Sequence, residues 1–418
     1  EPRFLNVMKI AIAKERRPHE RRVAATPDTI KRYLQWGFDV TVESGAGEAA
    51  SLSDAAYQAA GATVAATRAE TFADADIVLK VQRPRTMDDG GEDGLSDIPA
   101  GAFLIALHNP YGDPVGVEAY AAHNVVAFAM EMVPRISRAQ SMDVLSSQSN
   151  LSGYKAVIDG AANYTKAMPM LMTAAGRINP AKVFVMGAGV AGLQAIATAR
   201  RLGAIVSATD VRMASKQEVE SLGATFVMVE PDEGDTGQTA GGYAKDMSDD
   251  YKRRQAELIA GHIKDQDIVI TTALIPGRAA PTLVNDDMIA SMKSGSVIVD
   301  IAAEQGGNVT QTKPGEIATT ENGVKIIGEF NLPSRLATDA SALYSRNLMN
   351  FVELLVDVDE KKISIDWDDE IIIGTCLTRD SKIVHPALLP EEAKAPEPVA
   401  QADDDEDASE TDSTEKGA

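Results

Sequence analysis

The sequence predicts an α/β protein with two doubly wound, Rossmann-like parallel-sheet domains, a cleft between them and a disordered acidic C-terminal tail. Short apolar runs alternate with helical patterns, which is typical of parallel strands buried on both faces. The runs form two sets, and one long helical stretch, 146–175, lies between them. Each set is long enough for one doubly wound unit.

The first set of apolar runs predicts the strands of the first unit. Helical patterns near 27–36, 53–60, 68–74 and 114–123 separate these runs. The expected strands are Met8–Ala13, Asp39–Glu43, Asp76–Val81, Ala102–Leu107 and Val125–Met130. Because helices intervene between successive strands, we expect the strands to be parallel.

The second set predicts the second unit in the same way. Its expected strands are Lys182–Met186, Ile205–Thr209, Thr225–Val229, Asp267–Thr271, Ser296–Ile301 and Lys325–Ile327. Its expected helices are 190–202, 214–221, 248–264 and 286–292. The joining helix is expected to start at Ser146–Asn150, whose polar side chains supply capping groups.

The C-terminal part is expected to return to the first unit. A helix is predicted over 335–356, followed by short strands at Ile363–Trp367, Glu370–Thr375 and Lys382–Val384. The predicted domains are therefore a discontinuous first domain, a Rossmann domain and a tail, with the limits 8–145 plus 335–390, 146–334 and 391–418.

One segment fits neither helix nor strand. Residues 230–247 are too rich in glycine for a helix and too polar for a buried strand. A structureless insertion of this length is usually a functional lid or disordered. Both interpretations stay open at this point.

Charge and composition exclude several classes of function. The 418 residues carry a net charge of −22, which argues against nucleic-acid binding and against adhesion to anionic membranes. The tail holds eleven acidic residues and two lysines, so it accounts for −9 of this charge. No apolar run reaches the roughly 20 residues that span a bilayer, and no signal-peptide pattern is present. We expect a cytoplasmic protein that does not insert into the membrane.

No metal site is expected. The five histidines are scattered, and the single cysteine, Cys376, excludes both a disulfide within the chain and a multi-cysteine metal site. We expect Cys376 to be a packed small residue.

A glycine-rich turn predicts a dinucleotide site in the second unit. Gly187, Gly189 and Gly192 form G-x-G-x-x-G between the strand ending at Met186 and the following helix. The glycines permit a tight turn, close approach of pyrophosphate and close helix–strand packing. Asp210 ends the next strand, where a carboxylate binds the ribose 2′-OH and repels a 2′-phosphate. This favours NAD(H), although the nearby Arg212 could accept a 2′-phosphate.

Three further segments are distinctive: Pro134–Asp143 (PRISRAQSMD), Thr271–Gly277 (TTALIPG) and Ala240–Lys245 (AGGYAK). Together with the glycine motif they resemble the soluble NAD(H)-binding subunit of proton-translocating NAD(P) transhydrogenases, from about Met8 to Leu388. The resemblance implies hydride transfer between NAD(H) on this chain and NADP(H) on a partner, coupled to proton translocation. It also implies a homodimer that works with an NADP(H)-binding beta subunit and a membrane-spanning subunit, peripherally on the cytoplasmic face of the membrane.

The resemblance also implies which residues surround the nicotinamide. The family's conserved loop matches Arg135, Gln140 and Asp143, with Ser146 just beyond. Hydride transfer between two nicotinamides needs alignment of the rings and no acid–base pair. Gln140 offers amide groups for orientation, and Arg135 with Asp143 is expected to form an ion pair that holds the loop.

Further nucleotide contacts follow from the same resemblance. They are expected at Val190, Asp210, Val211, Arg212, Gly242, Gln255, Ala273 and Leu274. Tyr243 falls on the mobile loop with which the family closes over the nucleotide. This agrees with the interpretation of 230–247 as a lid.

Alanine dehydrogenase shares this architecture and is the alternative. Arg22, Lys80 and His108 stand where its substrate residues would, whereas Glu304 replaces an expected aspartate. The transhydrogenase family keeps residues similar to the two cations, so only His108 favours the alternative. The loop from Arg135 to Asp143 favours transhydrogenase, because alanine dehydrogenases lack it. A third hypothesis is a regulator that binds NAD(H) without catalysis.

Overall fold

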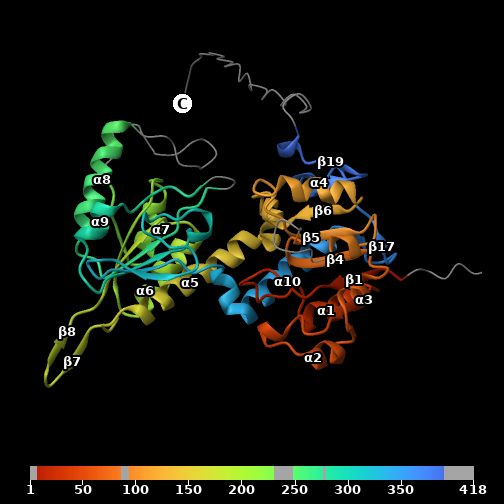
Figure 1. The fold of residues 1–418 in the computed structure, drawn as a ribbon, viewed down its shortest axis with the longest axis horizontal. Coiled ribbons are helices and arrows are strands. Elements are labelled where there is room, and N and C mark those ends of the chain that lie inside the picture. Colours follow the sequence, from red (N-terminus) through yellow and green to blue (C-terminus); the bar gives the residue numbers. More distant parts are fainter. Residues whose placement is uncertain (1–6, 86–93, 230–247, 276–278, 390–418) are drawn as a thin grey trace, which may run out of the picture.

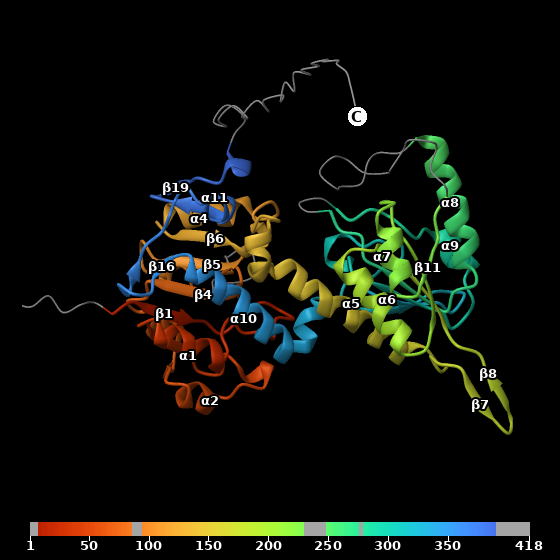
Figure 2. The ribbon, with the colours of Figure 1, turned by 180° about the vertical axis from the view of Figure 1, so that it is seen from behind.

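The computed structural model describes residues 7–85, 94–229, 248–275 and 279–389. Figure 1 shows two α/β units side by side, each with a twisted sheet between helices, and Figure 2 shows the same arrangement from behind. Two parallel-dominated sheets confirm the predicted fold class. The predicted tail, 391–418, lies outside the described residues.

The first sheet has eight strands in the order β19-β18-β6-β5-β4-β1-β2-β3. Its six parallel strands are β1 Lys9–Ile12, β2 Asp39–Glu43, β3 Thr63–Ala65, β4 Ile77–Gln82, β5 Phe103–Leu107 and β6 Val126–Ala129. The short strand β3 was missing from the prediction, because its exposed or half-buried residues give no apolar run. The helices are α1 Pro27–Gln35, α2 Asp54–Ala59, α3 Arg68–Phe72 and α4 Pro114–Ala122.

Both faces of this sheet are buried, as continuous apolar strands require. One face packs with Ile30 and Tyr33 of α1, and the other packs with Tyr120 of α4. The helix starts are set by the sequence: Thr26 caps α1, with Pro27 at its first position, and Asp113 caps α4.

The second sheet has seven strands in the order β11-β10-β9-β12-β13-β15-β14. They are β9 Lys182–Met186, β10 Ile205–Thr209, β11 Thr225–Phe226, β12 Ile268–Thr271, β13 Val297–Asp300, β14 Ile317–Thr319 and β15 Lys325–Ile327. Only β14 is antiparallel, and it was not predicted. The helices are α6 Val190–Arg201, α7 Ser215–Ser221, α8 Asp249–Ile263 and α9 Asp286–Ser291.

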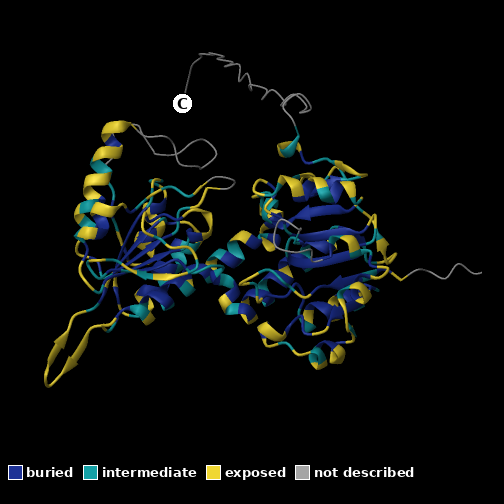
Figure 3. Ribbon diagram, viewed as in Figure 1, coloured by how far each residue is buried: buried dark blue, intermediate teal, exposed yellow. Residues whose placement is uncertain are grey.

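The joining helix differs from its prediction at both ends. Helix α5 spans Val144–Asn163, and Asp143 caps it, so the capping group precedes the predicted Ser146–Asn150. From Tyr164 on, the chain leaves the helix and forms a hairpin of β7 Leu171–Thr173 and β8 Gly176–Ile178. We call residues 169–179 the arm. It projects from the second unit, and Figure 3 shows it exposed along its length.

The C-terminal part packs on the first unit. Helix α10 (Ala337–Glu353) contributes Tyr344 and Phe351 to the core of the first sheet. The predicted strand at Glu370–Thr375 is wrong, because these residues form helix α11 with Asp369 as its cap. Strand β18 (Cys376–Arg379) follows and pairs antiparallel with β6, and β19 (Lys382–Ile383) pairs with β18. A small hairpin, β16 (Val356–Asp357) with β17 (Lys362–Ile363), precedes α11.

Candidate functional site

The predicted glycine motif lies where the strand order of the second sheet reverses. Strand β9 pairs with β10 on one side and with β12 on the other. Ligands of open α/β sheets bind outside the carboxyl ends of the strands at this switch point. Gly187 follows β9, and Thr272 follows β12. The Thr272 hydroxyl donates a hydrogen bond to the Gly187 carbonyl over 3.2 Å, which joins the two strand ends.

The three glycines have different structural roles. Gly187 has φ +111°, a left-handed conformation that favours glycine. A Cβ at Gly192 would lie 1.8 Å from the Gly187 carbonyl oxygen, so only glycine lets α6 approach the turn. A Cβ at Gly189 would meet nothing within 4 Å. Gly189 is also the N-cap of α6, and no side chain caps that helix end. Its N–H groups are therefore oriented as in pyrophosphate sites.

Asp210 is fixed at the end of β10 next to this turn. Its carboxylate accepts from the Ala188 N–H over 2.7 Å, so it holds the glycine turn. It also pairs with the Arg212 guanidinium, with 2.9 Å between Nε and Oδ1. This hydrogen bond raises the pKa of Arg212. The side chain of Asp210 is 7% exposed, and that of Arg212 is 32% exposed. Both predicted residues therefore lie at the sheet edge, joined as an ion pair.

Exposed apolar side chains surround the same edge. Val190, Val211 and Leu274 follow three neighbouring strands and are 41%, 55% and 46% exposed. Large apolar residues gathered around a polar turn suit a ligand with flat rings. Gln255 of α8 lies nearby, where its amide donates to the Thr209 hydroxyl and accepts from the Val229 N–H.

Two buried residues that the sequence did not single out support the loop after β12. Asn308 accepts from the Ala273 N–H over 3.0 Å and donates to the Ala273 carbonyl over 2.9 Å. Asp300 at the end of β13 accepts from the Asn308 N–H over 2.9 Å. Thr271 donates to the same carboxylate over 3.2 Å. The available signal was the Asp300 position, because it ends a predicted strand as Asp210 does.

The Pro134–Asp143 loop lies between the first unit and α5. Arg135 and Gln140 are exposed, whereas Ala139 and Met142 within the same loop are buried. Asp143 accepts from the backbone N–H of Ser146 over 2.9 Å. Among the described residues, the expected ion pair between Arg135 and Asp143 is not formed. The reason is that Asp143 serves as the cap of α5.

Helix α5 connects this loop to the glycine turn. A Cβ on Gly153 would lie 2.0 Å from the carbonyl oxygen of Ala191, so α5 and α6 touch backbone to backbone. Asn150 of α5 and Val190 of α6 line one pocket of about 460 Å³, which extends over α6 to α7. Ser146 lies seven residues before Gly153, or about 10 Å along the helix. The structure thus brings the start of α5 toward the predicted nucleotide site.

The residues of the alternative function form a buried polar cluster. Arg22 binds Glu20, with 2.7 Å between Nη2 and Oε2, and donates to Gln148 of α5 over 2.8 Å. Burial would raise the pKa of Glu20, but Arg22 lowers it to about 2. Asn331 donates to both Glu20 and Glu304, while burial raises the pKa of Glu304.

Lys80 and His108 lie in the same sheet with different neighbours. Lys80 is 1% exposed, with 3.5 Å between its Nζ and Glu15 Oε2. His108 is also 1% exposed, and its ring packs edge-on against Tyr120 of α4 at 5.0 Å. Burial lowers the pKa of His108 to about 3, so the ring is neutral at physiological pH. Arg22, in contrast, contacts α5.

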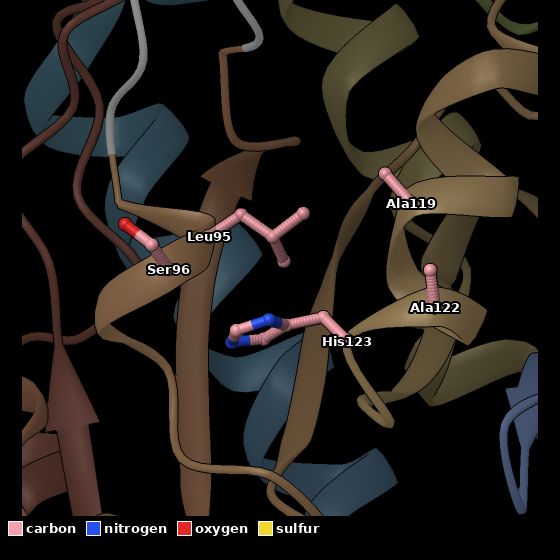
Figure 4. A pocket seen from close by; sticks show the side chains of 5 residues that line it. All are labelled: Leu95, Ser96, Ala119, Ala122 and His123. Carbon is pink, nitrogen blue, oxygen red and sulfur yellow. The ribbon is translucent and has the colours of Figure 1, made fainter.

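Several predictions fall outside these contacts. Gly242, Tyr243 and the whole 230–247 segment lie outside the described residues. Within the described ranges, no cluster of three or more His, Cys, Asp or Glu side chains could hold a metal ion. The same portion of the chain holds no helix long and apolar enough to cross a membrane. A further shallow pocket between Leu95 and His123, shown in Figure 4, contains none of the predicted residues.

Comparisons with known proteins cover nearly the whole chain. The families described as "Alanine dehydrogenase/PNT", N-terminal and C-terminal domains, match residues 11–152 and 156–386. The first portion of the NAD(P) transhydrogenase alpha subunit of Rhodospirillum rubrum, a separate protein, is 53% identical over 381 residues, which are 91% of this chain and 99% of that protein. A crystal structure of transhydrogenase from Sinorhizobium meliloti has a TM-score of 0.81 and 48% identity, covering 90% and 100% of the two chains. The alanine dehydrogenase of Halomonas elongata is 30% identical over 91% of this chain and 96% of its own.

Proposed function

Because the chain belongs to the alanine dehydrogenase/PNT family, we propose that it is the NAD(H)-binding subunit of a proton-translocating transhydrogenase. In this proposal hydride passes directly between NAD(H) on this chain and NADP(H) on a partner subunit. The observation that carries the proposal is the glycine turn at the switch point, with Asp210 bound to it and α5 leading from it to the Pro134–Asp143 loop.

The residues present fit a dinucleotide. The N–H groups at the start of α6 would hold the pyrophosphate, where Gly189 leaves open space. Asp210 would accept from the adenosine ribose. Val190, Val211 and Leu274 would contact the rings, because they are exposed apolar groups at the same sheet edge. When bound, NAD(H) supplies the nicotinamide carbon that gives or receives the hydride.

The protein's own contribution is orientation. Hydride transfer between two nicotinamides moves no proton, so no buried general acid or base is needed. Gln140 and Arg135 are exposed and could contact the nicotinamide and its ribose. Asp143 and Ser146 would act by fixing the start of α5. In this proposal Tyr243 and Gly242 close over the bound nucleotide.

The proposed partners are the NADP(H)-binding beta subunit and a membrane-spanning subunit. Hydride transfer between the soluble subunits would be coupled to proton movement through the membrane-spanning one. This chain would then work peripherally, on the cytoplasmic face of the membrane, through protein contacts. The acidic surface charge is compatible with this arrangement, since it does not favour direct binding to anionic lipid.

A second copy of the chain is the other proposed partner. The arm exposes Met170, Leu171, Met172 and Ile178, of which Met172 is 72% exposed. Residues 160–209, which include the arm, contain no acidic residue although the chain carries −22. An apolar, acid-free surface is what a homodimer interface requires. Met172→Asp should shift the sedimentation coefficient toward the monomer, whereas Val115→Asp on the exposed side of α4 should not. An unchanged dimer with Met172→Asp would contradict the role of the arm.

Reconstitution tests the activity. The purified protein is mixed with an NADP(H)-binding transhydrogenase subunit, NADH and a thio-analogue of NADP⁺, and formation of the reduced analogue is followed by absorbance. We expect turnover only when both proteins are present. Alanine-dependent reduction of NAD⁺ by this chain alone would overturn the proposal in favour of an alanine dehydrogenase. Binding of NADH without turnover in either assay would indicate a regulator.

The alanine dehydrogenase alternative rests on one group of residues. Arg22 and Lys80 are buried cations of the kind that bind a carboxylate substrate, but each is paired with a glutamate of this chain. His108 is buried and neutral against α4. This burial favours a structural role for His108, which was the residue that spoke for the alternative.

A further inference from the structure

The Pro134–Asp143 loop is held in place by residues that the motif itself does not contain. These residues come from α10 and from the start of α11, which lie far along the chain. Within the loop, Ala139 and Met142 are inserted in the core of the first unit and are 1% and 6% exposed. Gln140 lies between these two anchors, and its side chain is exposed.

Two asparagines of α10 hold the residue after Gln140. The Ser141 carbonyl accepts from the Asn347 amide over 2.8 Å and from the Asn350 amide over 3.0 Å. Asn347 is 7% exposed and also accepts from the Ser147 hydroxyl of α5 over 2.8 Å. Asn347 therefore ties the loop, α10 and α5 together at one point.

An arginine fork holds the other side of the loop. Arg138 binds Asp369 with two nearly parallel hydrogen bonds of 2.8 and 2.6 Å. Asp369 is itself fixed, because it caps α11 by accepting from the Ile371 N–H. The Arg138 side chain is 45% exposed, so this pair contributes little to folding stability. Its bidentate geometry nevertheless fixes an orientation.

We propose that Asn347, Asn350 and the Arg138–Asp369 pair are positioning residues that set the direction in which Gln140 and Arg135 face the nicotinamide. The backbone of Gln140 is fixed on both sides by these contacts, whereas its side chain has no hydrogen-bond partner among the described residues. Such a residue can orient a bound group without being reorganised itself. This inference rests on the proposed function, and it assigns the rate of hydride transfer to residues outside the motif.

Two variants test the inference with the whole protein and its NADP(H)-binding partner. Arg138→Gln removes the fork, and Asn350→Leu removes one amide donor at similar size. We expect each to slow single-turnover hydride transfer roughly tenfold, since small misplacements of reacting groups are costly. The dissociation constant for NADH, measured by fluorescence titration, should change by less than about twofold, because the glycine turn is untouched.

A matched control and a double variant complete the test. Arg68→Gln removes a comparable Arg–Asp pair, between Arg68 and Asp97, and should leave the rate unchanged. Arg138→Gln combined with Asp369→Asn should be no slower than the slower single variant, because both act through one contact. Wild-type rates in both Arg138→Gln and Asn350→Leu, or equal losses of rate and affinity, would overturn the inference. A wild-type protein that transfers no hydride would overturn the proposed function, and this inference with it.

Discussion

Gly153 of α5 lies directly against the carbonyl oxygen of Ala191 in α6, and a Cβ on Gly153 would approach that oxygen to 2.0 Å. This contact joins the helix that starts at Asp143 to the helix that starts at the glycine turn. It explains how a loop of the first unit and a nucleotide motif of the second can serve one site. The absence of a side chain at residue 153 is what permits it.

Gly153→Ala should therefore force the two helices apart. We expect the free energy of unfolding to fall by about 1–3 kcal/mol, as for other overpacked sites, and NADH affinity to fall with it. Denaturant titration and fluorescence binding measure the two effects. Gly261→Ala in α8 is the control, because its Cβ would meet nothing within 4 Å. It should be neutral or stabilise by up to about 1 kcal/mol. If Gly153→Ala behaves like the control, the helix contact is not as described.

The glycines of the turn should separate binding from stability. Gly189→Ala places a methyl group in open space, so the melting temperature should not change, but pyrophosphate should lose its close approach to the backbone. We expect NADH affinity to fall by about tenfold or more. Gly192→Ala should instead lower the melting temperature, since its Cβ would meet the Gly187 carbonyl. Unchanged NADH binding in Gly189→Ala would place the pyrophosphate elsewhere.

Asp210 should control the choice of nucleotide. Asp210→Ser removes the negative charge that repels a 2′-phosphate and frees Arg212 from its ion pair. We expect weaker binding of NADH and stronger binding of NADPH, both measured by fluorescence titration. Arg212→Gln serves as the comparison, because it keeps the carboxylate and should keep the preference for NADH. A preference for NADH that survives in Asp210→Ser would mean that another group reads the ribose.

A buried carboxyl group should make stability depend on pH. Burial raises the pKa of Glu131 to about 7, although it accepts N–H bonds from His108 and Asn109. The folded state therefore holds a proton that the unfolded chain has lost, and stability from this group falls as pH rises from about 4.5 to 7. Glu131→Gln should gain stability relative to wild type between pH 5 and pH 8, as thermal melts at the two values can measure. A difference that does not depend on pH would contradict this assignment.

Most of the framework could be predicted, because the strands of a parallel sheet are continuous apolar runs. The strands β9 and β10 were predicted to the residue, and most of the others to within one or two residues at each end. The errors occurred where local composition and tertiary contacts disagree. Glu370–Thr375 is rich in isoleucine and predicts a strand, but Asp369 caps it as a helix. The arm is rich in Ala, Leu and Met, which favour a helix, yet it forms an exposed hairpin.

The site could be predicted as a list of positions but not as a set of contacts. The glycine turn and Asp210 lie together as expected, because spacing along a βαβ unit fixes both. The contacts of Asp143 were not predictable, since a capping carboxylate and an ion-paired one look alike in a sequence. Asn308 and Asn347 were missed because each acts on a loop far away in the chain. The limits of the two domains and the roles of the individual site residues stay predictions.

The central claim is direct hydride transfer between two nucleotides held by two proteins, and an isotope label tests it most directly. NADH carrying deuterium at the transferred position of C4 is mixed with NADP⁺, this protein and the NADP(H)-binding subunit, and the NADPH formed is analysed by mass spectrometry. The account predicts that the label appears in NADPH without loss to water. NADPH without the label, or no NADPH while alanine is oxidised by this chain alone, would contradict it.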